Sequence, residues 1–310
     1  MKFKAHQSFF IRKGWLSKGI RAVEENSAIL MPSNSREAMD SLGLGANQVV
    51  ALKYWLTALG LIEKSSNKKE HTTTELCRVI SANDPYIEEL GTLWALHYNL
   101  ATNRDEATSW YWFFNRLNSK VFTKRDLVEG LHNFVTTYDP DQGDDKSSSK
   151  AVSSLESDID CIFSTYIPHE RLTGKHVSPE SVIDCPLGDL GIVDIENRSL
   201  KTYRKKSGKT DIPNMVVLYA ILKQLTAMRG EAPDDRARYA EIKISELLTG
   251  EGSPGKIFNL DSVQLLNKLY ELERLGHLTV NKTAGSDVVR ISSAETDPMQ
   301  CLTNYYEVLG

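Results

Sequence analysis

The chain has 310 residues, of which 41% are hydrophobic and 25% are charged, and its formal net charge is −4. This length exceeds one typical domain and the apolar content is enough for several modest cores, so we expect several packed modules. No segment approaches the roughly 20 continuous apolar residues that cross a bilayer, and the first residues show no signal-peptide pattern. We therefore expect a cytoplasmic protein without a membrane partner. The four cysteines contain no CxxC pair, which argues against a zinc cluster and a disulfide framework.

The charge distribution leaves room for a local nucleic-acid site. A net charge of −4 gives no overall attraction to phosphates, so such a site must come from clustered cations. Residues 1–70 hold 11 Lys or Arg against 6 Asp or Glu, a local balance of +5. An ordinary solvated surface produces the same bias, so charge alone does not decide between the two interpretations.

The segment from Ser35 to residue 80 is the most readable part of the chain. Its pattern predicts a short helix from Ser35 to Asp40, a glycine-containing turn, and a second helix over residues 47–61 with apolar side chains at helical spacing. The basic, polar turn EKSSNKKEH and a run of threonines follow, as expected of a two-stranded wing. This order of helix, turn, helix and wing is typical of a winged helix.

Two later regions repeat this order. Towards the C-terminus we expect a helix over residues 237–248, a second helix capped by Asp261, and a hairpin from LTVNK and DVVRIS. A weaker version has helical periodicity in FTKRDLVEGLHNFVTTY and SKAVSSLESDIDCIFSTYI. The polar segment DPDQGDDKSSSK between these two pieces is expected to be an exposed or mobile loop.

The remaining segments predict buried helices and a mixed connector. IEELGTLWALHYNLATN and ATSWYWFFNRL concentrate aromatic residues that favour buried helices, and short alternating apolar pieces after residue 176 favour strands. The fold class is therefore mainly α with small β wings and multiple winged-helix-like modules. The expected division is an N-terminal winged-helix-like module (1–85), a helical middle region (86–175), a mixed connector and helix (176–230) and a C-terminal winged-helix-like module (231–310).

The N-terminal module supplies the first candidates for contact with double-stranded DNA. The second helix of such a motif enters the major groove, so Asn47, Gln48 and Lys53 are predicted to contact bases or phosphates. Lys68 and Lys69 on the wing are predicted to neutralise phosphates. Modules of this kind also bind other proteins, and the sequence leaves that alternative open.

Two further basic segments are candidates. The N-terminal string HQSFFIRKGWLSKG mixes the cations Arg12, Lys13 and Lys18 with aromatic residues, as nucleic-acid surfaces do. A surface helix with a buried aromatic face would have the same composition. The run YRKKSGK, with Arg204 and Lys205, is a second basic patch, and a solvated loop is the alternative interpretation.

The candidates for hydrolytic chemistry are the acids Glu156, Asp158 and Asp160. On a helix, Glu156 and Asp160 share a face, so this pair is predicted to hold Mg²⁺ or Mn²⁺ with a third ligand from elsewhere. A solvated helix face is the alternative. The chain has no P-loop, GxSxG elbow or HExxH helix, which argues against an ATPase, a serine hydrolase and a zinc protease.

The N-terminal string resembles the signature F-x-x-H-E-x-F-x-x-R-x-G-W-L-x-K-G of a bacterial family formerly described as a domain of unknown function, the SspB-like family. Gln7 stands where that signature has an acid, which weakens a catalytic role for His6 with an acidic neighbour. The strings LGLGANQVVALKYWLTALGLI, TSWYWFFN, DIDCIFSTYIP and DCPLGDLGIV extend the resemblance to about residue 220. The positions that match the signature are Phe3, His6, Phe9, Arg12, Gly14, Trp15, Leu16, Lys18 and Gly19.

The resemblance implies a DNA-nicking component of a bacterial single-strand phosphorothioation and phage-defence system. It also implies partners in that system, namely a cysteine desulfurase, an ATPase and an ATP-pyrophosphatase-like sulfur-transfer enzyme. Together with the residues, it favours a metal-dependent DNA nicking endonuclease. The alternatives are a noncatalytic winged-helix adaptor that recruits the modifying enzymes and a transcriptional regulator of the same gene cluster.

Overall fold

The structure is a computed structural model that describes residues 1–138, 149–173, 184–207, 212–229, 241–283, 286–291 and 297–309. Helices dominate, and the strands of the described residues form three small antiparallel sheets. The predicted fold class, mainly α with small β elements, is confirmed. Most of the loop expected after residue 138 lies outside the described residues.

The first module, which we call the N-terminal module, has the predicted order of helix, turn, helix and hairpin. Gly43 ends the second helix with a positive φ of 66°, and Gly45 begins the next, where its N–H donates to Gln48 Oε1 at 3.0 Å. The strands pair in a register that places Lys64 opposite His71. The elements are α1 (Trp15–Glu25), η1 (Pro32–Asn34), α2 (Ser35–Leu42), α3 (Ala46–Ala58), β1 (Ile62–Lys64), β2 (His71–Thr73) and α4 (Glu75–Asn83).

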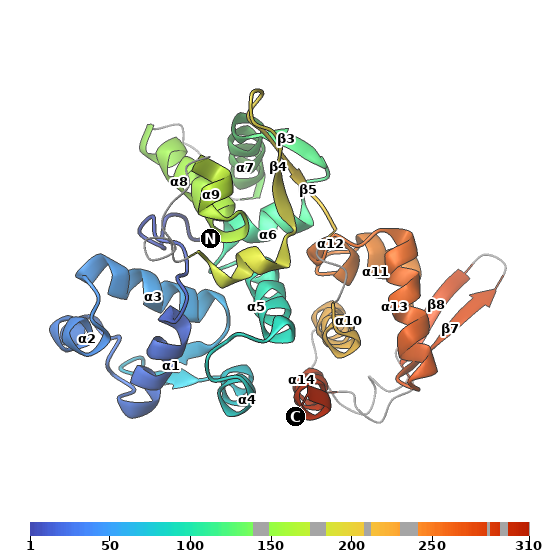
Figure 1. The fold of residues 1–310 in the computed structure, drawn as a ribbon, viewed down its shortest axis with the longest axis horizontal. Helices are drawn as coiled ribbons and strands as arrows, with labels where there is room; N and C mark the ends of the chain where they lie inside the picture. The colour runs from blue at the N-terminus through green and yellow to red at the C-terminus, as the bar shows by residue number, and fades with distance from the viewer. Residues whose placement is uncertain are drawn as a thin grey trace.

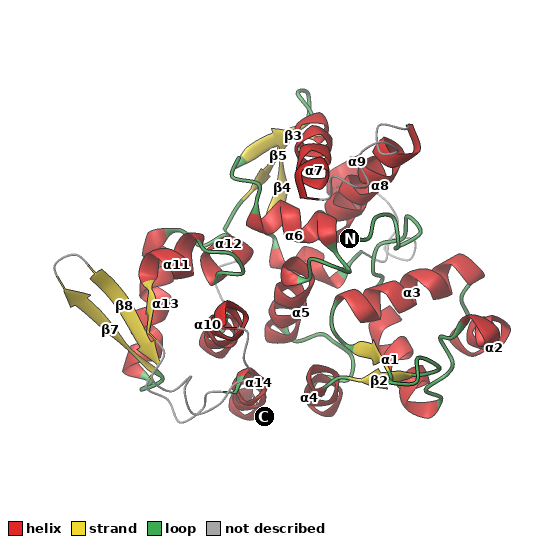
Figure 2. Cartoon of the chain, turned by 180° about the vertical axis from the view of Figure 1, so that it is seen from behind, coloured by secondary structure: helices red, strands yellow, loops and turns green. Residues whose placement is uncertain are grey.

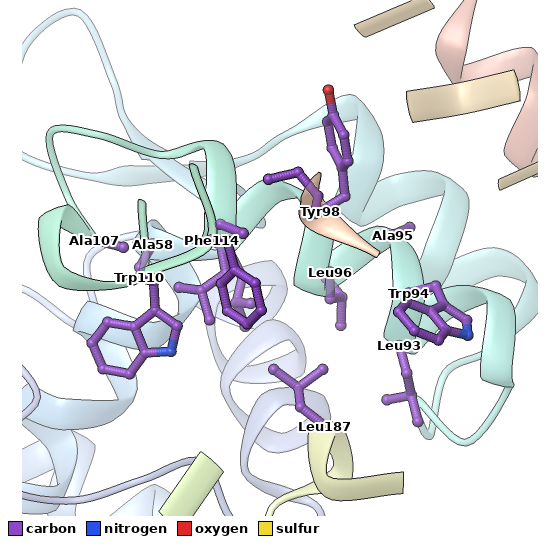
Figure 3. Close-up of a cluster of buried hydrophobic side chains, with 14 of the residues drawn as sticks. Ala58, Leu93, Trp94, Ala95, Leu96, Tyr98, Ala107, Trp110, Phe114 and Leu187 are labelled. Atoms are coloured by element: carbon purple, nitrogen blue, oxygen red, sulfur yellow. The ribbon is translucent and has the colours of Figure 1, made fainter. Parts of the chain in front are cut away.

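Two aromatic-rich helices, α5 (Leu90–Thr102) and α6 (Thr108–Asn115), form the centre of the molecule. Trp94, Trp110 and Phe114 are at most 1% exposed, and Figure 3 shows these side chains among leucines and alanines contributed by several elements. Burial of such rings is the main favourable term in folding. The prediction that these aromatic residues form the core, and not a base-stacking surface, is confirmed.

The next module, which we call the middle module, combines two predicted helices with a sheet. Its strands pair in the order β3-β5-β4, so the strand that precedes the helices lies beside the second strand of the following hairpin. The strands expected after residue 176 are therefore confirmed. The elements are β3 (Val121–Thr123), α7 (Lys124–Tyr138), α8 (Ser149–Tyr166), α9 (His169–Thr173), η3 (Pro186–Leu190), β4 (Val193–Asn197) and β5 (Thr202–Lys205).

The C-terminal module repeats the same order, with a sheet β6-β8-β7. The helix expected over residues 237–248 is wrong in part, because residues 241–243 form a strand that pairs with β8. The predicted Asp261 cap is confirmed, since its carboxylate accepts the Gln264 N–H at 2.8 Å. The elements are α10 (Asn214–Arg229), β6 (Glu241–Lys243), α11 (Ile244–Thr249), α12 (Pro254–Ile257), α13 (Ser262–Arg274), β7 (Leu278–Thr283), β8 (Ser286–Ile291) and α14 (Pro298–Leu309).

The N-terminal and C-terminal modules lie on opposite sides of α5, as Figure 1 shows in blue and in orange to red. The reverse view in Figure 2 gives the same arrangement. Helix α14 is bonded to the start of α5. Tyr305 Oη accepts the Gly91 N–H at 3.1 Å, and the hydroxyls of Thr92 and Tyr306 are 2.6 Å apart. None of the described helices is long and apolar enough to cross a membrane.

Candidate nucleic-acid interface

Helix α3 presents a polar outer face and a fully buried inner face. Leu52, Trp55 and Leu56 are completely buried against the core, whereas Asn47 is exposed at the first turn and Lys53 is half-buried. Gln48 is predicted to contact bases, but its side chain is occupied in capping the helix at Gly45. The face available to a ligand therefore consists of Asn47, Lys53 and their neighbours.

The β1–β2 hairpin carries three exposed lysines beside α3: Lys64, Lys68 and Lys69. The turn is held by its own polar groups, since the carboxamide oxygen of Asn67 accepts the Ser65 hydroxyl at 2.6 Å and the Lys69 N–H at 2.9 Å. Lys68 and Lys69 lie at the predicted wing tip. Together with Lys53 and Lys64, they form what we call the α3–hairpin surface.

The cations of this surface lack acidic partners. Within the described ranges, no ion pair involves Lys53, Lys64, Lys68 or Lys69. Burial lowers the pKa of Lys53, and the positive charges of Lys64 and Lys2 lower it further. Mutual repulsion of this kind marks a place where an anion would be favourable.

The other predicted cations near the N-terminus have different surroundings. The guanidinium of Arg12 lies 5.5 Å from the ring centroid of Trp15, and Lys13 pairs with Glu88 at 2.9 Å. Lys18 is exposed on α1. The ring of Trp15 is buried against the core, whereas Phe9 and Phe10 are partly buried, so the segment is held to the core by its aromatic side.

The second predicted basic patch does not form one surface. Arg204 is exposed and pairs with Glu196 at 3.1 Å. Lys205 points inward: its ammonium donates to the Phe113 and Leu117 carbonyl oxygens, the latter at 2.9 Å. Burial lowers the pKa of Lys205 to about 7. The reason for the difference is strand alternation, which turns successive side chains of β5 to opposite faces.

The three acids on α8 are likewise divided between solvent and the interior. Glu156 and Asp160 are exposed on one face and line a shallow hollow together with Ser153, Ser157 and Ser164, as their spacing predicts. Asp160 also pairs with Lys124 at 2.7 Å. Asp158 faces the interior and is 2% exposed, so it does not join them. Among the residues that the structure describes, no group of three or more His, Cys, Asp or Glu side chains is placed to hold a metal ion.

Asp158 instead anchors the N-terminal segment to the core. Its carboxylate accepts the Lys4 N–H at 2.8 Å, His6 Nε2–H at 2.9 Å and the Ser109 hydroxyl at 2.6 Å. Because His6 Nδ1 accepts the Ser8 N–H, the imidazole is neutral and carries its proton on Nε2. The acid missing beside His6 in the sequence is thus supplied from α8, in a buried structural arrangement.

Sequence reasoning missed His71 and Lys64 as neighbours of Lys53. Lys64 lies directly opposite His71 in the hairpin register, and residues at such positions on antiparallel strands share a face. Within the part of the chain that the structure describes, neither ring nitrogen of His71 has a hydrogen-bond partner. Burial, followed by the positive charges of Lys53 and Lys64, lowers the pKa of His71. Nothing in the composition of the turn alone marks that histidine.

The protein is modular and mainly helical, because an order of helices and a hairpin recurs along the chain. Its first module carries the lysine-rich α3–hairpin surface, which gives that module a basic face. The sequence profile of the family described as "Protein of unknown function (DUF4007)" matches residues 3–306, and the chain belongs to that family. The fold is similar to the crystal structures of SspB and of magnesium-ion-bound SspB. Each has a TM-score of 0.82 and 25% sequence identity, covering 99% of this chain and 88% of that chain. Comparison with curated proteins gives no match.

Proposed function

We propose that the protein is a DNA-binding component of a bacterial single-strand phosphorothioation and phage-defence system. The observation that carries the proposal is the α3–hairpin surface, whose four lysines have no acidic partner among the described residues. Phosphate contacts of this kind supply most of the sequence-independent affinity for DNA. The likeness to SspB supports the choice of system.

The three modules are proposed to be winged helices, with α3 of the first one directed to double-stranded DNA. The middle and C-terminal modules share the order of one strand, three α-helices and a hairpin, with the second hairpin strand at the centre of each sheet. Asn47 is exposed at the start of α3, where a recognition helix contacts base edges. The corresponding face of α8 carries Glu156 and Asp160, so the modules differ in the ligands that they suit.

Strand nicking with Mg²⁺ or Mn²⁺ is the activity that we propose for the middle module. Glu156 and Asp160 fit such an ion, because Mg²⁺ is commonly held by one or two carboxylates with water and substrate phosphate as the other ligands. A bound ion of this type activates water and neutralises phosphate charge. The magnesium-bound SspB structure supports the choice of metal. The partners proposed are the ATPase, the cysteine desulfurase and the ATP-pyrophosphatase-like enzyme of the same system.

A noncatalytic DNA-binding adaptor is the second candidate. It is favoured by the position of Asp158, which is committed to His6 and Ser109 and leaves only two exposed acids on α8. Such an adaptor would use the same α3–hairpin surface and recruit the modifying enzymes to DNA.

Conversion of supercoiled plasmid to open circles separates these candidates. The purified protein is incubated with Mg²⁺, Mn²⁺ or EDTA, while a gel shift monitors binding to the same plasmid. The nickase predicts metal-dependent nicking that is lost in Glu156→Gln/Asp160→Asn and retained in Glu307→Gln, an exposed acid on α14. Binding without nicking in every metal establishes the adaptor, and absence of both activities at low salt overturns the DNA role.

A further inference from the structure

A hollow of about 830 Å³ lies beside α3, between that helix, the β1–β2 hairpin and the segment that precedes α2. Its floor is one face of α3, formed by Val50, Lys53, Tyr54 and Thr57, which follow one another at helical spacing. Leu30 and Ile62 are among the apolar residues that line it. This volume is in the range of sites that enclose a small ligand.

The charge at the hollow is predominantly positive. Lys2, Lys53 and Lys64 line it, and Lys2 is paired with Glu106 at 2.5 Å. Lys53 and Lys64 form no ion pair within the described residues, and the acids of the lining are Glu63 and Glu106. Three cations therefore face two acids, which leaves one positive charge in excess.

The lining also holds polar groups that the protein does not satisfy. His71 is 1% exposed, and neither of its ring nitrogens has a hydrogen-bond partner among the described residues. Buried polar groups without partners are costly, and native proteins normally pair them with protein, water or ligand.

We propose that this hollow holds one unpaired nucleotide of a DNA strand, with the base against the exposed Val50 and Pro32 and the phosphate on Lys53 and Lys64. The inference rests on the DNA-binding function proposed above and adds the form of DNA that is recognised. An apolar wall beside unpaired cations fits a ligand that is part ring and part anion. The hollow lies between α3, the hairpin and the segment before α2, so a base that has left the stack can enter it.

The expected consequence is a preference for unpaired DNA. Extruding a base from a duplex breaks its pairing and stacking, and this cost is absent in a single strand. The wing lysines Lys68 and Lys69 are outside the hollow and remain available to either form.

The test is fluorescence anisotropy of the full-length protein with a 20-nucleotide strand and with the same strand in a blunt duplex. Val50→Trp fills the hollow at a side chain that is 47% exposed, and Val308→Trp, at an 86% exposed valine of α14, is the matched control. Because the tryptophan side chain occupies the volume proposed for the base, we expect Val50→Trp to weaken strand binding about tenfold and duplex binding less than about threefold. Val308→Trp should change neither.

Two further arms make the outcome decisive. Lys68→Gln/Lys69→Gln should weaken duplex binding at least as much as strand binding, the reverse of Val50→Trp. Free deoxyadenosine monophosphate should not displace the strand at micromolar concentration, because it lacks the wing contacts. Equal loss for both DNA forms in Val50→Trp, or no loss, overturns the inference while leaving duplex binding intact. Displacement by micromolar mononucleotide identifies a free nucleotide as the ligand and also overturns it, whereas wild-type protein that binds neither form overturns the proposed function itself.

Discussion

At the scale of single residues, neighbouring side chains of like charge have different roles according to their burial. Asp158 and Glu156 are two positions apart on α8, yet one is inside the core and the other is in solvent. Lys205 and Arg204 differ in the same way on β5. A change at any of these positions must therefore be interpreted through its surroundings before it is assigned to DNA binding or catalysis.

Replacement of Asp158 is expected to cost stability, not a specific chemical step. Asp158→Ala leaves two buried donors, on His6 and Ser109, and the partly buried Lys4 N–H without their acceptor, so we expect a loss of about 3 kcal/mol in the free energy of unfolding. Glu156→Ala should change it by less than about 0.5 kcal/mol, since it is exposed. Urea denaturation of both variants measures this, and equal stabilities would contradict the anchoring role of Asp158.

His97 is expected to make the fold sensitive to mild acid. Tyr166 donates to Nδ1 and Nε2–H donates to the Ile257 carbonyl oxygen, each at 2.8 Å, so the ring is held neutral. Burial lowers its pKa to about 4, from the ordinary value of 6.5. Below pH 6.5 the unfolded chain therefore binds a proton that the folded chain does not, and stability falls as the pH falls towards 4.

The size of the His97 effect follows from that difference in pKa. We expect this residue to remove about 2 kcal/mol of stability between pH 7 and pH 5. Urea denaturation at the two pH values should show this loss in the wild type and a smaller one in His97→Gln, where position 97 no longer titrates. The same loss in both proteins would show that other groups cause it.

At the scale of helices and strands, the sequence predicted the elements whose signals are local and missed those that depend on long-range contacts. Helical periodicity and Asp261 located α3 and α13, because those signals are local. Strand β6 was missed, because EIK becomes extended only by pairing with β8, about 45 residues later in the chain. The anchoring of His6 by Asp158 joins residues 152 positions apart, which no local pattern reveals.

The contact between α5 and α14 gives a prediction at this scale. A Cβ at Gly91 would lie 2.3 Å from the Tyr305 ring, so Gly91→Ala forces that ring away and breaks the Gly91 N–H bond to its hydroxyl. We expect a loss of about 1–3 kcal/mol in urea denaturation. Combining it with Tyr305→Leu should cost less than the sum of the single changes, since both act on one contact. Simple additivity would contradict the packing described here.

At the scale of the whole molecule, the net charge of −4 conceals a basic first module. The sequence predicted the wing lysines Lys68 and Lys69, but the hollow beside α3 depends on the approach of segments from five parts of the chain. Local propensity cannot place such segments together. The same limit applies to α8, where periodicity paired Glu156 with Asp160 but did not show that Asp158 points inward.

The measurement that tests the central claim most directly is duplex affinity as a function of salt concentration. Each phosphate contact contributes a slope of about −0.9 to log K against log salt, so Lys68→Gln/Lys69→Gln should reduce the slope by about 2. Arg125→Gln/Arg171→Gln removes the same charge from exposed cations already paired with Glu129 and Asp194, and it should retain the wild-type slope. Equal slopes for all three proteins, or no duplex binding by the wild type at low salt, would contradict DNA binding through the α3–hairpin surface.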